Sequence, residues 1–208
     1  MVLVFEESCC ENIRQFFKSY LSSADKMKPF GASSFYPIIK ERWKNATTVN
    51  SETEATILAG YKIKFPSKMP LDYNLQFGTV ETAPYDNNKF VVLFYSKEPL
   101  TDTMRLNEFF KQNGIWINYR RWVTTTGKGS FDFGIPDYLR FIKKERGDGY
   151  EITINGHRGI ATSQRDRLFH GVDIHDPSQV EFNLDETHIT IQGYFAKENL
   201  IKVAESIK

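Results

Sequence analysis

Short strand-like runs, several of them alternating between apolar and polar residues, recur through most of this chain and restrict its fold more than any other feature. A strand points successive side chains to opposite faces of a sheet, so an alternating run forms a strand with one buried face. The runs cover residues 61–65, 74–82, 89–95, 115–123, 150–154, 157–161, 180–184 and 188–194. Asn155-Gly156, between two of them, is a strong signal for a two-residue hairpin. The pattern predicts a mainly antiparallel sheet.

Helical patterns account for much of the remaining chain. Ser8-Cys-Cys-Glu11 and Ser51-Glu-Thr-Glu54 are capping boxes, which predict helices starting at these points. The first helix has an apolar face made by Ile13, Phe16, Phe17, Tyr20 and Leu21. Further helices are expected at residues 38–43, at 106–112 with Gly114 just after its end, and at 136–144.

The chain closes with a strand that runs directly into an amphipathic helix. Its expected buried stripe consists of Leu200, Val203, Ala204 and Ile207. Glu198 and Lys202 are four residues apart in the favourable order, and such a pair adds about 0.3 kcal/mol. The chain also contains 17 Phe and 10 Tyr, which favour a sheet with an aromatic core. We therefore expect an α+β domain over residues 51–208, with two or three helices packed on the sheet, and an N-terminal helical appendage over residues 1–50.

Composition argues against several functional classes. The 27 basic and 26 acidic residues nearly balance, whereas nucleic-acid binding depends on a basic excess. No apolar run is long enough to cross a membrane, and the short apolar start does not match a signal peptide, so the chain as written is expected in the cytoplasm. Cys9 and Cys10 are adjacent and cannot form a disulfide framework; at the start of a helix they are either ordinary or reactive thiols. Nothing in the sequence calls for a cofactor.

One strand combines aromatic and arginine side chains. Trp116, Tyr119, Arg120, Arg121 and Trp122 form a composition that suits stacking on bases or sugars, or a contact with another protein. The alternative is a strand with one core face and one solvent face. If a surface of this chain binds a partner, it is expected here.

A second candidate site is a polar segment near residues 166–176. Asp173 and His175 would lie on one side of a strand, and with His170 they could bind a divalent metal. The segment matches no compact metal-binding motif. The alternative is a polar loop with solvated charges.

Three segments carry a resemblance to a known family. They are Gly60 to Tyr73, the hairpin Ile154-Asn-Gly-His-Arg-Gly159, and the ending Ile189 to Ile207, which contains Lys-Glu-Asn-Leu-Ile-Lys-Val-Ala-Glu-Ser-Ile. Over residues 52–208 the chain resembles the family called domain of unknown function 4367. The resemblance implies an extracytoplasmic, often membrane-anchored module and no catalytic motif. Ala196 stands where that family places Ser or Thr at the helix N-cap, a change that costs about 1 kcal/mol.

The sequence therefore favours a non-enzymatic binding or interaction module, with a protein as one possible partner. If the resemblance holds, the module is associated with the cell envelope. One alternative is a metal-dependent hydrolase that uses His170, Asp173 and His175. Another is a structural subunit that buries the face from Ile13 to Leu21 against a partner helix.

Overall fold

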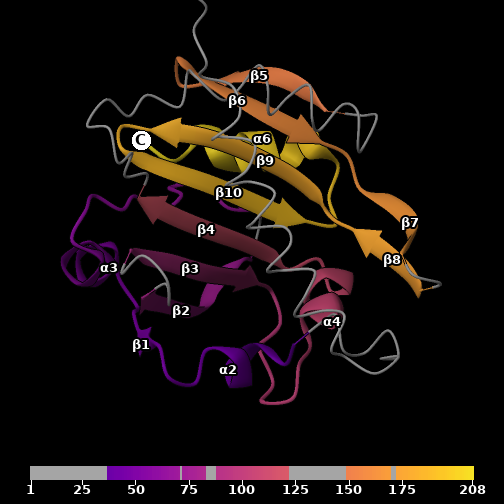
Figure 1. Ribbon diagram of the computed structural model, residues 1–208, viewed down its shortest axis with the longest axis horizontal. Helices are drawn as coiled ribbons and strands as arrows, with labels where there is room; N and C mark the ends of the chain where they lie inside the picture. The colour runs from indigo at the N-terminus through magenta and orange to yellow at the C-terminus, as the bar shows by residue number, and fades with distance from the viewer. Residues whose placement is uncertain (1–36, 71, 83–87, 122–148, 170–171) are drawn as a thin grey trace, which may run out of the picture. The chain divides into compact units, whose positions relative to one another are not determined.

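An eight-stranded antiparallel sheet dominates the computed structural model, which describes residues 37–70, 72–82, 88–121, 149–169 and 172–208 (Figure 1). The strands lie in the order β1-β2-β3-β4-β10-β9-β6-β5. Their bounds are β1 Thr47–Thr48, β2 Asn74–Thr82, β3 Lys89–Ser96, β4 Ile115–Arg121, β5 Tyr150–Ile154, β6 His157–Thr162, β9 Ser178–Leu184 and β10 Thr187–Gly193. A separate hairpin is formed by β7 (Arg165–Phe169) and β8 (Val172–Asp176). The expected α+β fold with a mainly antiparallel sheet is confirmed.

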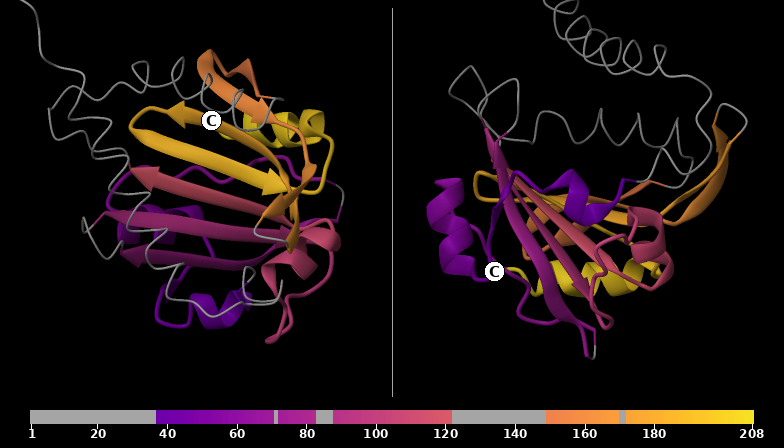
Figure 2. Two further views of the ribbon diagram at one scale, coloured as in Figure 1. Left: turned by 45° about the vertical axis from the view of Figure 1, so that its right-hand side comes forward. Right: turned by 90° about the horizontal axis from the view of Figure 1, so that it is seen from below.

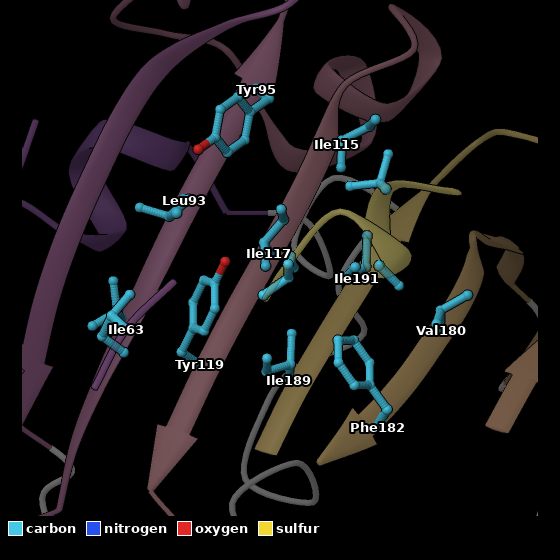
Figure 3. Packing of buried hydrophobic residues seen from close by; sticks show 14 of the residues in the cluster. Ile63, Leu93, Tyr95, Ile115, Ile117, Tyr119, Val180, Phe182, Ile189 and Ile191 are labelled. Carbon is cyan, nitrogen blue, oxygen red and sulfur yellow. The ribbon is translucent and has the colours of Figure 1, made fainter. Parts of the chain in front are cut away.

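One face of the sheet, here called the apolar face, carries the larger core. Its strands contribute alternate residues, and helices α3 (Glu52–Ala59) and α6 (Lys197–Glu205) contribute residues to the same cluster. Figure 3 shows the side chains of this face, which include Leu93, Ile117, Tyr119, Phe182, Ile189 and Ile191. Each fully buried Ile, Leu or Phe contributes about 1.5–3 kcal/mol, so this layer supplies most of the stability.

The opposite face carries a smaller and more aromatic cluster. Two short helices, α2 (Ile39–Arg42) and α4 (Leu106–Lys111), pack over Val92 and Phe94 of β3. In the right-hand view of Figure 2, α2 and α6 lie on opposite sides of the sheet. The two clusters therefore lie on opposite sides of the sheet, and among the described residues the second covers the part of its face near β2, β3 and one end of β4.

The expected closing helix is confirmed. Leu200, Val203, Ala204 and Ile207 are all buried, and Ala196 is the N-cap without a side-chain hydrogen bond. The prediction of an ion pair between Glu198 and Lys202 is wrong, because the two side chains do not pair. Lys202 instead lines a groove described below. The Asn155-Gly156 hairpin is also confirmed, with positive φ of 50° and 85° at the two turn residues.

The strand expected at residues 61–65 does not form, although its alternation is real. Tyr61 and Ile63 are buried, but the segment pairs with no strand of the described chain. Side chains of α3 satisfy its backbone instead: Thr56 Oγ1 accepts from the N–H of Ile63 at 3.1 Å, and a Glu52 carboxylate oxygen accepts from the N–H of Phe65 at 2.9 Å. The alternating pattern therefore predicted correctly which side chains are buried. The backbone N–H groups, however, bond to side chains of α3 instead of to a neighbouring strand.

The end of α4 also differs from the expectation. Asn113, with φ of 60°, takes the left-handed position assigned to Gly114. Gly114 is required for another reason, because a Cβ atom there would lie 2.4 Å from ring carbons of Phe109. Its N–H donates to the carbonyl of Phe109 at 2.8 Å and closes the helix.

Residues on both sides of the expected domain boundary at residue 50 pack into the same two clusters. Ile39, Trp43 and Val49 precede it and are buried. The chain from Tyr36 to Lys208 forms one compact unit. The helices expected at residues 8–22 and 136–144 lie outside the described residues.

Candidate functional site

Strand β4 separates the residues of the expected binding strand onto two faces of the sheet. Tyr119 lies on the apolar face with no exposed surface, so its inclusion in a binding surface is wrong. Arg121 lies on the same side and donates from Nε and Nη2 to Glu186 Oε2, at 3.1 and 2.9 Å. Trp116 and the exposed Arg120 lie on the opposite face. Trp122 lies outside the described residues.

The face that carries Trp116 and Arg120 becomes polar where α2 and α4 no longer cover it. Strand pairing places the polar side chains of four neighbouring strands side by side. We call this surface the polar face; it consists of Trp116, Asn118 and Arg120 of β4, His188, Thr190 and Gln192 of β10, Gln179, Glu181 and Asn183 of β9, and Thr162 of β6. The candidate site is this surface.

A hydrogen-bonded network runs across the polar face. His188 Nε2 lies 3.3 Å from Glu181 Oε2, and the two side chains are only 15% and 11% exposed. His188 Nδ1 lies 2.9 Å from Asn183 Oδ1, so both ring nitrogens face oxygen atoms. Gln192 Nε2 donates to Gln179 Oε1, and Gln179 Nε2 donates to Glu181 Oε1. The network holds a carboxylate and an imidazole in a mostly buried position.

Several polar atoms on the same side of the sheet are buried without a partner. In the part of the chain that the structure describes, the buried side-chain atoms that make no hydrogen bond are Trp43 Nε1, Thr79 Oγ1, Asn107 Oδ1, Trp116 Nε1, Asn118 Oδ1 and Thr162 Oγ1. Every one belongs to this face of the sheet or to the helices packed on it. A buried polar group left without a partner costs about 1–3 kcal/mol, and native proteins keep few of them.

Three of these atoms border the network directly. In the strand register Trp116 is opposite Gln192, Asn118 is opposite Thr190, and Thr162 is opposite Gln179. Together they are an indole donor, an amide acceptor and a hydroxyl group. The polar face therefore holds three buried polar groups whose hydrogen bonds are not made by the described residues.

The buried tyrosines of the apolar face are structural. Tyr61 Oη lies 3.1 and 3.0 Å from the carbonyl oxygens of Lys89 and Tyr119, and Tyr119 Oη donates to the carbonyl of Lys64 at 2.7 Å. Burial raises the pKa of Tyr61, Tyr95 and Tyr119 well above that of a free phenol. These hydroxyl groups therefore remain protonated, and those of Tyr61 and Tyr119 act as hydrogen-bond donors inside the core.

The expected metal ligands Asp173 and His175 lie on β8, where the sequence left open either a strand or a polar loop. Both project from one side of the strand, as its period requires. His175 Nδ1 contacts Asp166 Oδ1 of β7, and the His175 ring packs edge-on against Tyr194 with centroids 4.5 Å apart. Among the described residues no three His, Cys, Asp or Glu side chains gather to hold a metal. His170 lies outside them.

Sequence reasoning did not identify Glu181, Gln179 or Thr162. Their only signal was a polar residue at alternate positions of neighbouring runs, which acquires meaning when the strand order is known. Cys9, Cys10 and the face from Ile13 to Leu21 lie outside the described residues.

No protein-family model matches this chain, and a search of curated proteins also finds no match. Among the described residues, no helix has both the length and the apolar character needed to cross a membrane.

Proposed function

We propose that this chain is a non-enzymatic binding module whose polar face recognises an uncharged ligand rich in hydroxyl or amide groups. The observation that supports this proposal is the concentration of unpartnered buried polar atoms on one side of the sheet. The apolar face supplies none of them. Because these atoms are buried, neighbouring side chains move aside in the proposed complex, and a ligand with both donors and acceptors then satisfies them.

The residues around these atoms suit such a ligand. Trp116 offers an indole ring and a donor, and ring stacking on bases or sugars is sequence-tolerant and favourable. Arg120 is exposed, and the His188 side chain is partly exposed, so solvent reaches this end of the polar face. As part of the same hypothesis, we propose that the chain is related to the cell-envelope family named above and lies outside the cytoplasm.

The test uses the indole N–H signals of the three tryptophans in a proton–nitrogen correlation spectrum. Trp116→Phe assigns the Trp116 signal, and a panel of neutral mono- and disaccharides and nucleosides is then titrated into the full chain. We expect at least one probe to shift the Trp116 signal in a saturable way. If no probe shifts it, the polar face does not bind this class of ligand.

Thr162→Val sharpens the test because it removes one hydroxyl and keeps the side-chain shape. Loss of one ligand hydrogen bond of about 1.4 kcal/mol weakens binding about tenfold. Thr79→Val is the matched control, since Thr79 lies on the same side of the sheet but outside the network. Equal weakening by both variants, or by neither, would contradict the assigned contact.

A further inference from the structure

A groove lies between the segment of residues 67–70 and the C-terminal helix α6. Its volume is about 810 Å³, within the range of small-molecule sites. Because α6 packs on the apolar face, the groove lies on the side of the sheet opposite the polar face. It is thus a separate candidate site, and its argument does not depend on the proposed function.

Both walls of the groove are fixed to the end of α6. The backbone N–H and Oγ of Ser67 donate to the carbonyl of Ser206, at 3.3 and 2.9 Å. From the β5–β6 turn, Asn155 Nδ2 donates to the carbonyls of Glu205 and Ile207, at 3.1 and 2.9 Å. These bonds satisfy carbonyls that a helix end leaves unpaired. The groove is therefore preformed, and these side chains are occupied in holding it.

The remaining charged groups of the groove are mostly basic. Lys68, Lys202 and Lys208 line it, with Glu205 as the one acidic residue of the lining. Within the described part of the chain, none of the three lysines forms an ion pair. Lys202 lacks even the pair with Glu198 that helix spacing would permit. The groove thus presents unneutralised positive charge, which complements an anion.

Apolar side chains also line the groove. Met69 and Phe195 are partly buried there, and Val203 of α6 is buried beside them. The Phe195 ring is supported by an edge-on contact with Tyr73, with centroids 6.0 Å apart. A small hydrated anion would leave this apolar surface unused, whereas an anion with an aliphatic chain would cover it.

We propose that the groove binds an anionic amphiphile, a single aliphatic chain that ends in an acidic head group. The head group lies between Lys68 and Lys202, and the chain covers Met69, Phe195 and Val203. The two lysines come from the two walls, so a bound head group bridges the 67–70 segment and α6.

The experiment titrates sodium decanoate, below its micelle concentration, into the full chain and follows the backbone amides of residues 67–69 and 199–203. Decanol, acetate and decyltrimethylammonium are titrated in parallel. We expect saturable shifts with decanoate, weaker binding of decanol and acetate, none with the cation, and weakening of decanoate binding as salt is added.

Lys68→Gln combined with Lys202→Gln should weaken decanoate binding about two- to thirtyfold, because each exposed charge pair contributes about 0.2–1 kcal/mol. Lys111→Gln, an exposed lysine of α4 that does not line the groove, should leave it unchanged. Equal affinity for decanol and decanoate would overturn the role of the lysines. Equal affinity for acetate, absence of saturable shifts, or binding of a glutamate-rich peptide without decanoate would overturn the proposed ligand class.

Discussion

At the scale of single residues, Ala196 is the clearest weak point. It is the exposed N-cap of α6 and offers no side-chain oxygen to the free N–H groups of the first turn. Ala196→Ser should stabilise the fold by about 1 kcal/mol, which raises the melting temperature by about 2–4 °C. Thermal unfolding followed by circular dichroism measures this. Ala196→Val adds size without a hydroxyl and should bring no gain; an equal gain would show that capping is not the cause.

Thr79 is a residue whose polar atom weakens the fold. Its side chain is fully buried on β2, and Oγ1 has no hydrogen-bond partner among the described residues. Thr79→Val replaces the hydroxyl by a methyl of similar shape and should raise the free energy of unfolding by about 1–3 kcal/mol. Thr48→Val is the control variant, because Thr48 is the exposed neighbour of Thr79 on β1. Denaturant unfolding of both variants decides: no stabilisation from Thr79→Val would mean that a bound water satisfies the hydroxyl.

Single residues were predictable from the sequence where local chemistry decided their role. The stripe from Leu200 to Ile207 follows from spacing, and the missing cap at Ala196 follows from the comparison with the resembled family. The roles of Asn113 and Gly114 could not be separated in this way. Both residues suit a helix end, and only the ring of Phe109 determines which position requires the absence of a Cβ atom.

At the scale of elements, Glu52 links α3 to the extended segment that follows it. Its carboxylate accepts from Lys64 Nζ at 2.8 Å and from the N–H of Phe65 at 2.9 Å. Burial alone would raise the pKa of Glu52, but these bonds and the charges of Lys64 and Lys62 outweigh burial and lower it below its ordinary value of 4.5. The carboxylate is therefore more acidic in the folded state than in the unfolded chain.

This shift predicts how stability depends on pH. Because the folded-state pKa is the lower one, the contribution of Glu52 is fully present above pH 4.5 and is lost as the pH falls through the folded-state value. Glu52→Gln should lower stability at pH 7 by about 1 kcal/mol, a modest figure because the Glu52 side chain is 38% exposed. Denaturant unfolding at several pH values measures the difference, which should shrink below pH 4. Glu98→Gln, at an exposed loop position, should show no such trend.

Most strands were predictable because one face of each is buried and the other is not. The segment at residues 61–65 shares that pattern, but side chains of α3 accept its backbone hydrogen bonds. Alternation alone cannot show whether a segment bonds to a neighbouring strand or to a helix. The β7–β8 hairpin had the opposite problem. Its charged residues resemble a solvated loop, and the pairing of Arg165 with Asp176 becomes visible only in three dimensions.

At the scale of the whole molecule, the two faces of one sheet have different roles. Among the described residues, the fully buried polar atoms that lack a partner all lie on the side of the sheet opposite the apolar face, which combines an aromatic cluster with polar residues. Along the chain the polar residues of β4, β9 and β10 are spread from Trp116 to Gln192. The order of the strands in the sheet brings these residues together, and this order cannot be obtained from one sequence. The candidate site was therefore only partly predictable, through Trp116 and Arg120.

The Glu181–His188 pair connects β9 to β10. Substituting these two residues singly and together tests whether the polar face is a cooperative unit. Removing one partner of a buried polar pair leaves the other without compensation, so Glu181→Ala should lower the free energy of unfolding by about 1–3 kcal/mol. His188→Ala should cost a similar amount. The double variant should cost less than both together, with a coupling of about 1–2 kcal/mol.

An exposed ion pair provides the control for this cycle. Lys40 Nζ and Asp102 Oδ1 are 2.8 Å apart, but their side chains are 40% and 89% exposed, so solvent screens the pair and the same cycle there should give a much smaller coupling. Urea unfolding of all single and double variants measures both couplings. Equal couplings at the two sites would mean that the polar face behaves as ordinary surface, and that its network does not hold Glu181 and His188 in place for a ligand. A larger coupling at Glu181 and His188 would show that the fold keeps these polar groups together despite their burial.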